Sequence, residues 1–296
     1  MKIAIVVLNY NGLKDTQECI SSLKVLKPGD FTTEIIVVDN DSGDQSKETF
    51  KRQTGITFIS NSKNLGFSGG NNVGIKKALE MGADAILILN NDTFVASSML
   101  VELVRSLERA DIISPKIYFA PGFEFHKSRY AKAEKGKVIW YAGARIDWEN
   151  IIGMHTGVDE VDRGQFSKAS EIDFATGAAM IVKKEVFEKI GFFDEKYFLY
   201  LEDMDFCVRA KNYNFKILFE PKAIVWHKNA KSAGGSGSRI QDYYFTRNRL
   251  LFAVKYAKLR TKFAVFRQTL KSLREPTKRK AVIDFLMLKF GKGNIK

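Results

Sequence analysis

Short apolar runs that end in polar side chains constrain the fold of this chain more than any other feature. Residues 86–93 read Ile-Leu-Ile-Leu-Asn-Asn-Asp-Thr, so four apolar residues lead directly into Asn90, Asn91 and Asp92. An apolar run without alternation is typical of a strand buried on both faces, as in the middle of an α/β sheet. Taken alone, the polar triplet fits a turn better than a ligand site, because Asn and Asp are common turn formers.

Two earlier apolar runs end in the same way. Residues 2–8 run into Asn9 and Asn11, and residues 34–38 run into Asp39 and Asp41. With a further strand at 56–60, these runs alternate with segments of helical pattern, which predicts a parallel sheet wound with helices. Ligands of such sheets bind at the carboxyl ends of the strands. Three polar clusters at that edge favour a nucleotide site over three chance turns, and Asp92 is a hard oxygen ligand suited to Mg²⁺ or Mn²⁺ on a diphosphate.

The segment from 64 to 74 is rich in glycine and asparagine. It contains Asn64, Gly66, Gly69 and Asn71 and leads into a helix expected at 75–81. Glycines let backbone amides approach a ligand closely, and a helix amino terminus favours anions. The segment matches neither the dinucleotide-binding fingerprint nor the P-loop.

The middle of the chain is expected to cover and complete the site. After a helix at 97–109, residues 115–172 mix glycines, charges and aromatics without a clear period, which favours hairpins and loops. A strand is expected at 174–182, where Gly177 leaves room for a ligand against the backbone. A short helix at 184–190 follows.

Three carboxylates lie within four positions, at Glu202, Asp203 and Asp205, amid aromatic residues. On a helix, Asp205 and Arg209 are one turn apart and are able to form a purely structural ion pair. Asp203 then points elsewhere and is left for chemistry. Like-charge neighbours in an apolar setting raise the pKa of a carboxyl group toward that of a useful general base. His227 follows two strand-like pieces, 215–219 and 223–225. This is a plausible position for a metal ligand, but a single histidine is by itself weak evidence for one.

The last fifth of the chain is strongly basic. Residues 239–296 hold 16 of the 47 Lys and Arg residues but only 3 of the 34 Asp and Glu residues, so the remainder is neutral. Basic and apolar residues interleave at helical spacing, interrupted at Pro276, and such helices bind anionic membrane surfaces. A solvated helical face is the alternative, and the lack of a nucleic-acid fold signature argues against nucleic acid. Before this segment, the loop Gly234–Ser238 is expected to close over a diphosphate.

Composition excludes several classes of protein. The two cysteines are too few for a disulfide framework and fit a reducing compartment. No secretory signal and no apolar stretch of about 18 residues is visible, so a spanning helix is not expected. We predict a domain over 1–238, with a nucleotide-binding half at 1–110 and a catalytic half at 111–238, followed by a basic helical segment at 239–296.

Together these motifs resemble the family 2 glycosyltransferases, most closely the bacterial rhamnosyltransferase-like branch. They occur in family order over roughly residues 3–250. The matching pieces are Val7–Gly12, Val37–Ser42, Asn64–Asn71, Leu89–Asp92, Ala175–Ala179, Tyr200–Phe206 and Trp226–His227. The resemblance implies a GT-A fold, with a mostly parallel central sheet flanked by helices, and inverting transfer from a nucleotide-diphospho-sugar.

The resemblance also implies roles for individual residues. Asp39 would contact the nucleotide base, and Asp203 would be the catalytic base with Glu202 as its neighbour. Asn90-Asn91-Asp92 stands where the family has its DXD motif, with Asn at the first acidic position, so Asp92 would carry the divalent metal (Mg²⁺ or Mn²⁺), joined by His227. The residues expected to bind the donor are Asn9, Asn11, Asp39, Asp41, Asn64, Gly66, Gly69, Asn71, Asn90, Asn91 and Gly177.

The expected donor is deoxythymidine-diphospho-rhamnose or a uridine-diphospho-sugar, used in cell-surface polysaccharide synthesis. The expected acceptor is a glycan or a polyprenyl-diphosphate-linked sugar, reached from the cytoplasm at the inner face of the membrane; oligomerisation stays open. One alternative is a nucleotidyltransferase, which would need a basic activation loop that residues 9–13 lack. The other is a non-catalytic membrane-surface or carbohydrate-binding protein on the same fold, and the intact pair Glu202–Asp203 argues against it.

Overall fold

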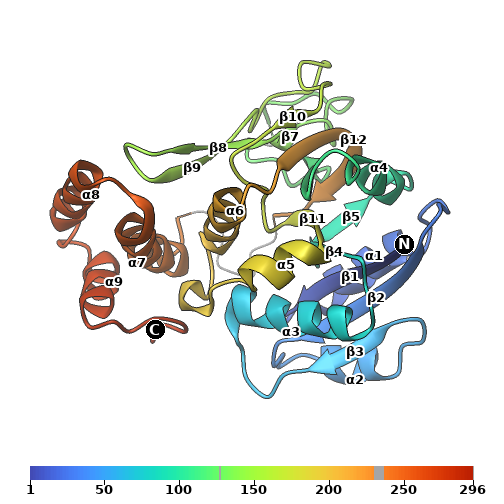
Figure 1. The fold of residues 1–296 in the computed structure, drawn as a ribbon, viewed down its shortest axis with the longest axis horizontal. Coiled ribbons are helices and arrows are strands. Elements are labelled where there is room, and N and C mark those ends of the chain that lie inside the picture. The colour runs from blue at the N-terminus through green and yellow to red at the C-terminus, as the bar shows by residue number, and fades with distance from the viewer. Residues whose placement is uncertain (127, 230–236, 296) are drawn as a thin grey trace.

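The computed structural model describes residues 1–126, 128–229 and 237–295, and its centre is one large sheet (Figure 1). Among these residues, ten strands form the sheet. Eight of them follow the order β10-β12-β6-β11-β4-β1-β2-β3, and the other two lie at its side, β5 beside β12 and β7 beside β6. The strands are β1 Lys2–Asn9, β2 Thr32–Asp39, β3 Thr57–Ser60, β4 Ala85–Asn90, β5 Thr93–Val95, β6 Ile112–Phe119, β7 Ile139–Tyr141, β10 Ser170–Glu171, β11 Ala179–Lys183 and β12 Ile217–His227. A separate hairpin pairs β8 Ala144–Asp147 with β9 Ile152–His155.

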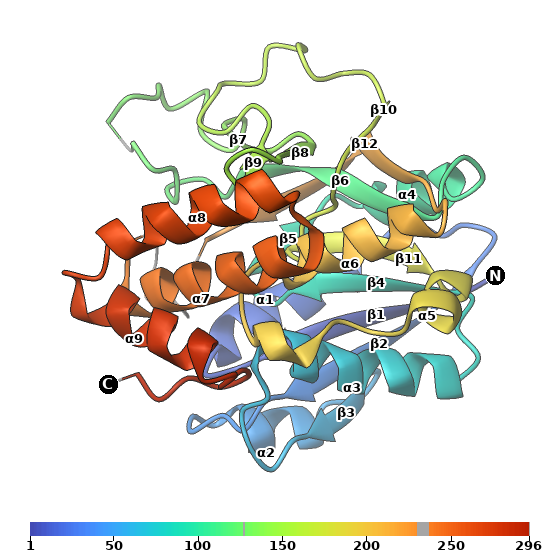
Figure 2. The same cartoon turned by 60° about the vertical axis from the view of Figure 1, so that its left-hand side comes forward.

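Helices cover the sheet and form one end of the molecule. They are α1 Leu13–Leu23, α2 Ser46–Lys51, α3 Gly66–Glu80, α4 Met99–Ser106, α5 Lys184–Ile190, α6 Glu202–Asn212, α7 Arg239–Tyr256, α8 Leu259–Lys271 and α9 Pro276–Leu286, with a 3₁₀ turn, η1, at Glu195–Tyr197. The three C-terminal helices group together beside α6 rather than on the sheet (Figures 1 and 2). No helix in the described parts of the chain is long and apolar enough to cross a membrane.

The half of the sheet that carries the predicted polar clusters is parallel. β1 pairs in parallel with both β2 and β4, and the register sets Asn9 opposite Asp39 and Leu8 opposite Asn90. β11 runs antiparallel between β4 and β6. The central strands are almost wholly buried, as their unbroken apolar sequence requires. The predicted α/β fold, with a mostly parallel central sheet flanked by helices, is confirmed.

The glycine-rich segment is helix rather than loop, which corrects the expectation that a helix starts near residue 75. α3 begins at Gly66, and its glycines let it lie very close to β1. A Cβ added at Gly70 or Gly74 would lie 2.4 Å from the side chain of Leu8 or Val6. Contact with the sheet therefore explains these two glycines, because any larger residue would push the helix away.

Two strand expectations also change. The pieces expected at 215–219 and 223–225 are one strand, β12, whose pairing with β6 shifts register between Glu220 and Ile224. Pro221 is accommodated at that irregularity, where no ladder hydrogen bond is needed. The strand expected at 174–182 begins only at Ala179, which leaves 174–178 as a turn facing α6. Pro276 lies in the first turn of α9, a position proline favours, rather than inside a longer helix.

Candidate active site

The polar ends of β1 and β2 form a hydrogen-bonded group that we call the strand-edge cluster, consisting of Asn9, Asp39, Ser42 and Asn91. The Asn9 side-chain amide donates to the Asp39 carboxylate at 2.9 Å and to the Ser42 hydroxyl at 3.1 Å. The Ser42 backbone N–H donates to the other Asp39 oxygen at 3.1 Å. Asn9 and Asp39 have no exposed surface. The cluster fixes both strand ends. Because Asp39 has no exposed surface, a nucleotide base could contact it only after the loops around it shift.

Asn91 joins the end of β4 to this cluster through α1. Its amide donates to the Thr16 hydroxyl at 2.9 Å, and that hydroxyl donates to Asn9 Oδ1 at 2.7 Å. Gly12 is needed beside them, since a Cβ there would lie 2.4 Å from Asn91 Nδ2. Sequence reasoning missed Thr16 and Ser42, although Ser42 directly follows the predicted Asp39–Asp41 cluster.

Asn40, which the sequence places in the polar cluster after the second strand without a predicted role in binding, organises the turn before α3. Its amide donates to Asn64 Oδ1 and to the Gly66 carbonyl, both at 3.0 Å. Its carbonyl oxygen accepts from Asn61 and from the Leu65 backbone. Asn64 therefore shapes the turn. At Gly66, whose φ is +75°, an added Cβ would lie 2.4 Å from the Phe198 carbonyl oxygen.

The other predicted donor residues differ in environment. Asn71 Oδ1 is buried without a hydrogen-bond partner among the described residues, an orphan acceptor beside the strand edge. A Cβ added at Gly69 would collide with the Leu65 side chain, so close packing explains why glycine occupies this position. Asn11 and Asp41 are exposed in left-handed backbone, where a donor can reach them. The loop expected to close over the diphosphate lies outside the described residues except for its last two positions, 237 and 238.

The fold brings the two predicted metal ligands together although they are far apart in sequence. β5 follows Asp92 directly and pairs antiparallel with β12, which sets Thr93 opposite His227. As a result, His227 Nε2 lies 3.0 Å from Asp92 Oδ1, with both residues buried. The edge of the Trp140 ring packs against His227 with ring centroids 4.6 Å apart. Trp140 belongs to the segment that was expected to cover the site.

This pair fits a divalent cation. Carboxylate oxygen and imidazole nitrogen suit Mn²⁺, and two adjacent octahedral ligands about 2.1 Å from one ion would be about 3.0 Å apart. The described residues contain no group of three or more His, Cys, Asp or Glu side chains able to hold a metal. Asp92 and His227 would therefore hold a cation only with help from water and from the ligand's own phosphates, as is usual for Mg²⁺ sites.

The second cluster lies at the start of α6. Asp203 accepts hydrogen bonds from the backbone N–H of Gly177 at 2.9 Å and of Met204 at 2.8 Å. Among the three carboxylates it alone keeps partial exposure, since Glu202 and Asp205 are buried. Gly177 is tightly enclosed, because a Cβ there would lie 2.8 Å from the Phe67 ring. Gly177 thus acts on Asp203 through its backbone N–H.

Burial raises the pKa values of both Glu202 and Asp203, but their neighbours act in opposite directions. Burial, and then the neighbouring Asp203 charge, raise the pKa of Glu202 well above its usual range. Burial also raises the pKa of Asp203, but the N–H groups of Gly177 and Met204 oppose the shift. The raised pKa of Glu202 favours its protonated form, whereas the two N–H groups at Asp203 favour the ionised form of that carboxyl group. Two carboxyl groups with different environments are typical of acid–base sites.

Asp205 is structural, as predicted. Its carboxylate accepts from Arg209 Nε at 2.9 Å, one turn along α6, and from the Tyr256 hydroxyl at 2.8 Å. Lys255 of α7 also donates to it. With three charged or polar groups around one fully buried carboxylate, Asp205 joins α6 to α7 and is not available for chemistry.

A short path joins the two clusters. The Asn90 backbone N–H donates to the Ala178 carbonyl at 2.9 Å, and the preceding residue, Gly177, donates to Asp203. The end of β4 that leads to Asp92 and the Asp203 carboxylate are therefore held by neighbouring residues of one turn. A model of glycosyl transferase family 2 matches residues 4–191, which covers more than half of the chain. The chain belongs to this family.

Relatives in the family are sugar transferases. The low-salt glycan biosynthesis hexosyltransferase Agl10 of Haloferax volcanii is 27% identical over 252 residues, covering 84% of this chain and 74% of the relative. The dTDP-rhamnosyl transferase RfbF of Shigella flexneri is 26% identical over 260 residues, covering 84% and 79%. The N-acetylglucosaminyl-diphospho-decaprenol L-rhamnosyltransferase of Mycobacterium tuberculosis is 22% identical over 250 residues, covering 78% of each chain.

Solved structures confirm the GT-A fold of this glycosyltransferase. GalNAc-T7, crystallised with UDP, GalNAc and Mn²⁺, aligns with a TM-score of 0.62 at 16% identity, over 97% of this chain and 56% of that chain. The mannosyltransferase PcManGT from Pyrobaculum calidifontis, in complex with GDP-Man and Mn²⁺, aligns with a TM-score of 0.57 at 14% identity, over 99% and 76%.

Proposed function

We propose that this family 2 glycosyltransferase moves a sugar, with inversion, from a nucleotide-diphospho-sugar to a hydroxyl of a glycan or lipid-linked acceptor in cell-surface polysaccharide synthesis. The observation that carries this proposal is the placement of Asp203, a half-buried carboxylate that accepts the Gly177 N–H. The next residue, Ala178, accepts the N–H of Asn90, two residues before the Asp92 that pairs with His227. A base and a diphosphate anchor on neighbouring segments are what such a transfer requires. Rhamnosyltransferase relatives support deoxythymidine-diphospho-rhamnose as donor, with uridine-diphospho-sugars next.

The proposed chemistry uses this chain's residues as follows. Asp203 takes the proton from the acceptor hydroxyl as that oxygen forms a bond to the anomeric carbon. The bond between the anomeric carbon and the diphosphate oxygen breaks, and the nucleotide diphosphate leaves with the electron pair. Asp92 and His227 would hold the divalent cation, which supplies charge stabilisation to the leaving diphosphate. The orphan acceptor of Asn71 and the strand-edge cluster position the donor.

A donor panel with product detection tests this function. We expect turnover with one diphospho-sugar in the presence of Mn²⁺ or Mg²⁺, and a loss of about 10²–10⁴-fold in kcat for Asp203→Asn, because the amide cannot take a proton. Asp173→Asn, which removes an exposed carboxylate bonded to Lys211, is the matched control and should keep full activity. Full transfer by Asp203→Asn would remove Asp203 as the base. No turnover of any donor by the wild type would favour a non-catalytic carbohydrate-binding protein.

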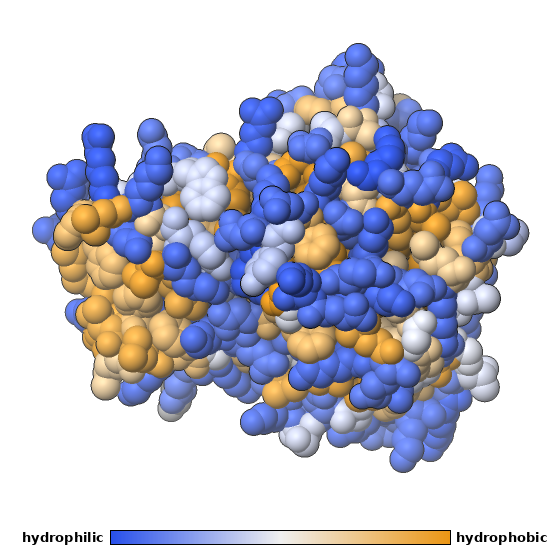
Figure 3. Space-filling model, viewed as in Figure 1, coloured by the Kyte–Doolittle hydropathy of each residue, from blue (hydrophilic) through white to orange (hydrophobic). Residues whose placement is uncertain are grey.

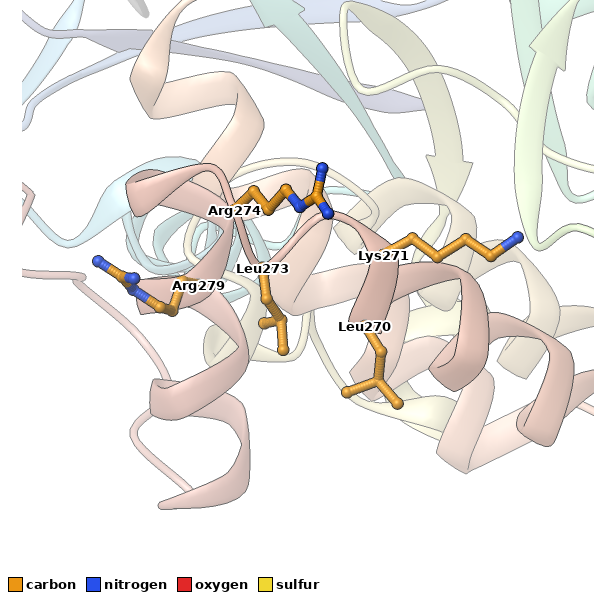
Figure 4. A pocket seen from close by; sticks show the side chains of 5 residues that line it. All are labelled: Leu270, Lys271, Leu273, Arg274 and Arg279. Carbon is orange, nitrogen blue, oxygen red and sulfur yellow. The ribbon is translucent and has the colours of Figure 1, made fainter.

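We also propose that α8 and α9 dock on an anionic membrane surface, which would place the enzyme at the inner face of the membrane beside a polyprenyl-linked acceptor. An apolar patch covers this end of the molecule (Figure 3), and Leu259, Phe263 and Leu288 are about 70% exposed or more. Basic residues surround it. A depression of ≈ 710 Å³ is lined by Leu270, Lys271, Leu273, Arg274 and Arg279 (Figure 4).

Charge and apolar exposure together favour a membrane over a solvated face or a protein partner. Apolar side chains enter the interface while Lys and Arg attract anionic lipid, each contributing about 1 kcal/mol. Reversing Lys271, Arg274 and Arg279 to Glu should weaken flotation with phosphatidylglycerol vesicles by at least about ten-fold. Reversing the exposed Lys51, Arg52 and Lys63 is the matched control. Equal binding by both triple variants, or binding to neutral vesicles alone, would refute docking through this surface.

A further inference from the structure

The segment before α6, which we call loop 197–201, holds its backbone in a conformation that its own sequence disfavours. Phe198, Tyr200 and Leu201 have φ values of 53°, 69° and 70°. Left-handed backbone is rare for bulky residues and persists only where the surroundings impose it. The loop ends one residue before Glu202, so the φ values of Tyr200 and Leu201 set the direction in which α6 starts and Asp203 points.

The surroundings that impose this conformation come from α7. The side-chain amide of Asn248 lies 2.8 Å from each of three loop carbonyls, those of Tyr197, Leu199 and Tyr200. Asn248 is fully buried, and its own oxygen accepts from Arg247 Nε at 3.2 Å. Buried carbonyls need partners, and a loop without regular pairing has to find them outside itself.

Other contacts from α7 act on the same loop. Arg247, also fully buried, donates to the Lys196 carbonyl at 3.1 Å. The ring of Tyr244 stacks on Phe198 with centroids 5.2 Å apart. On the other side of the loop, the Phe67 backbone N–H at the start of α3 donates to the Phe198 carbonyl at 2.7 Å. Loop 197–201 is therefore held between the helix that follows the strand edge and the first C-terminal helix (Figure 2).

Resting on the proposed function, we propose that Asn248 is a positioning residue, whose amide holds loop 197–201 in its left-handed conformation and thereby orients Asp203 toward the acceptor hydroxyl. α7 then takes part in positioning the base, although Asn248 touches no reacting atom. Packing alone does not explain Asn248, because an apolar residue of the same size would fill the space but remove a donor from three carbonyls. Of these, the Tyr197 carbonyl also accepts from the Leu199 backbone N–H.

Asn248→Ala and Asn248→Asp test this role. Aspartate keeps the size of the side chain but offers no donor when ionised, so both variants should behave alike. The matched control is Tyr243→Phe, on the same helix, which removes a buried hydrogen bond of 2.6 Å to Asp284 of α9 and leaves the loop carbonyls paired. The first measurement is amide hydrogen exchange of residues 197–205, which does not depend on turnover. It should speed up in both Asn248 variants and stay unchanged in the control.

The kinetic measurements separate positioning from general stability. We expect kcat to fall by about 100-fold in the Asn248 variants, because misplacing a reacting group slows the chemical step by about this factor. The donor KM should stay within about two-fold, because the strand-edge cluster binds the donor elsewhere. Loosening the loop admits water to Asp203 and lowers its pKa, so the acid limb of the kcat–pH profile should move to lower pH.

The outcomes are distinct. Unchanged loop exchange in Asn248→Ala, or an equal loss of kcat in Tyr243→Phe, overturns the proposal. If the wild type turns over no donor but loop exchange still rises selectively in the Asn248 variants, the role of Asn248 in holding the loop stands and the proposed function fails.

Discussion

The strand edge and loop 197–201 both contain left-handed backbone, but they achieve it by opposite means. At the strand edge, Asn11 and Asp41 have φ values of 51° and 67°, and these residue types tolerate such values. The Asn11 side chain links the loop after β1 to the loop after β2 by accepting from the Gly43 N–H at 2.7 Å. In loop 197–201 the residues are Phe, Tyr and Leu, each costing about 1–2 kcal/mol there, and the support comes from α7.

This difference separates two tasks of the enzyme. The strand-edge cluster is held by hydrogen bonds among residues 9–91, and we assign it to holding the donor. The proposed base, Asp203, follows a segment whose carbonyls are held by Asn248, about 45 residues later in the chain. Changes at the strand edge should therefore affect donor and cation binding, and changes around the loop should affect the chemical step.

The largest effect at the strand edge is expected from Asp92→Ala. Removing this carboxylate should lower transfer by at least about 100-fold and abolish the dependence of nucleotide-diphosphate binding on Mn²⁺, because His227 would be left as a lone ligand. Titration calorimetry with nucleotide diphosphate, with and without Mn²⁺, measures the binding. Asp30→Ala, at an exposed carboxylate, serves as control. Metal-dependent binding that persists unchanged in Asp92→Ala would contradict the assignment.

A smaller effect is expected from Glu202→Gln, which replaces the protonated acid by an amide of the same shape. Because Glu202 acts beside the base rather than as the base, kcat should stay within about ten-fold of the wild type. A loss as large as that of Asp203→Asn would show that the two carboxyl groups share the role of base, and would remove the distinction drawn between them.

The same variant should change how stability depends on pH. The folded-state pKa of Glu202 is raised, so its contribution is fully present below the unfolded value of about 4.3 and is lost as pH rises toward the folded value. The wild type should therefore lose up to about 1.4 kcal/mol of unfolding free energy per pH unit in that window relative to Glu202→Gln. Urea unfolding at several pH values measures this, and parallel curves would contradict a buried, protonated Glu202.

Much of the donor half could be predicted from the sequence, because strand and ligand signals lie side by side there. Apolar runs that end in Asn9, Asp39 and Asn90 predict both the parallel strands and the shared edge, and the register confirms it. The helix start at Gly66 could not be predicted in this way. Glycine is a poor helix former, and only the closeness of α3 to β1 makes Gly70 and Gly74 favourable there.

The sequence by itself determined the alternation of strands and helices, the polar edge and the presence of the carboxylate cluster, since each depends on residues that are neighbours in the chain. Only the tertiary structure decided which distant groups meet. The pairing of β5 with β12 brings His227 to Asp92, and the packing of α7 brings Asn248 to the loop before Asp203. These contacts arise from burial and hydrogen-bond satisfaction across the whole fold, which leave no local pattern in the chain.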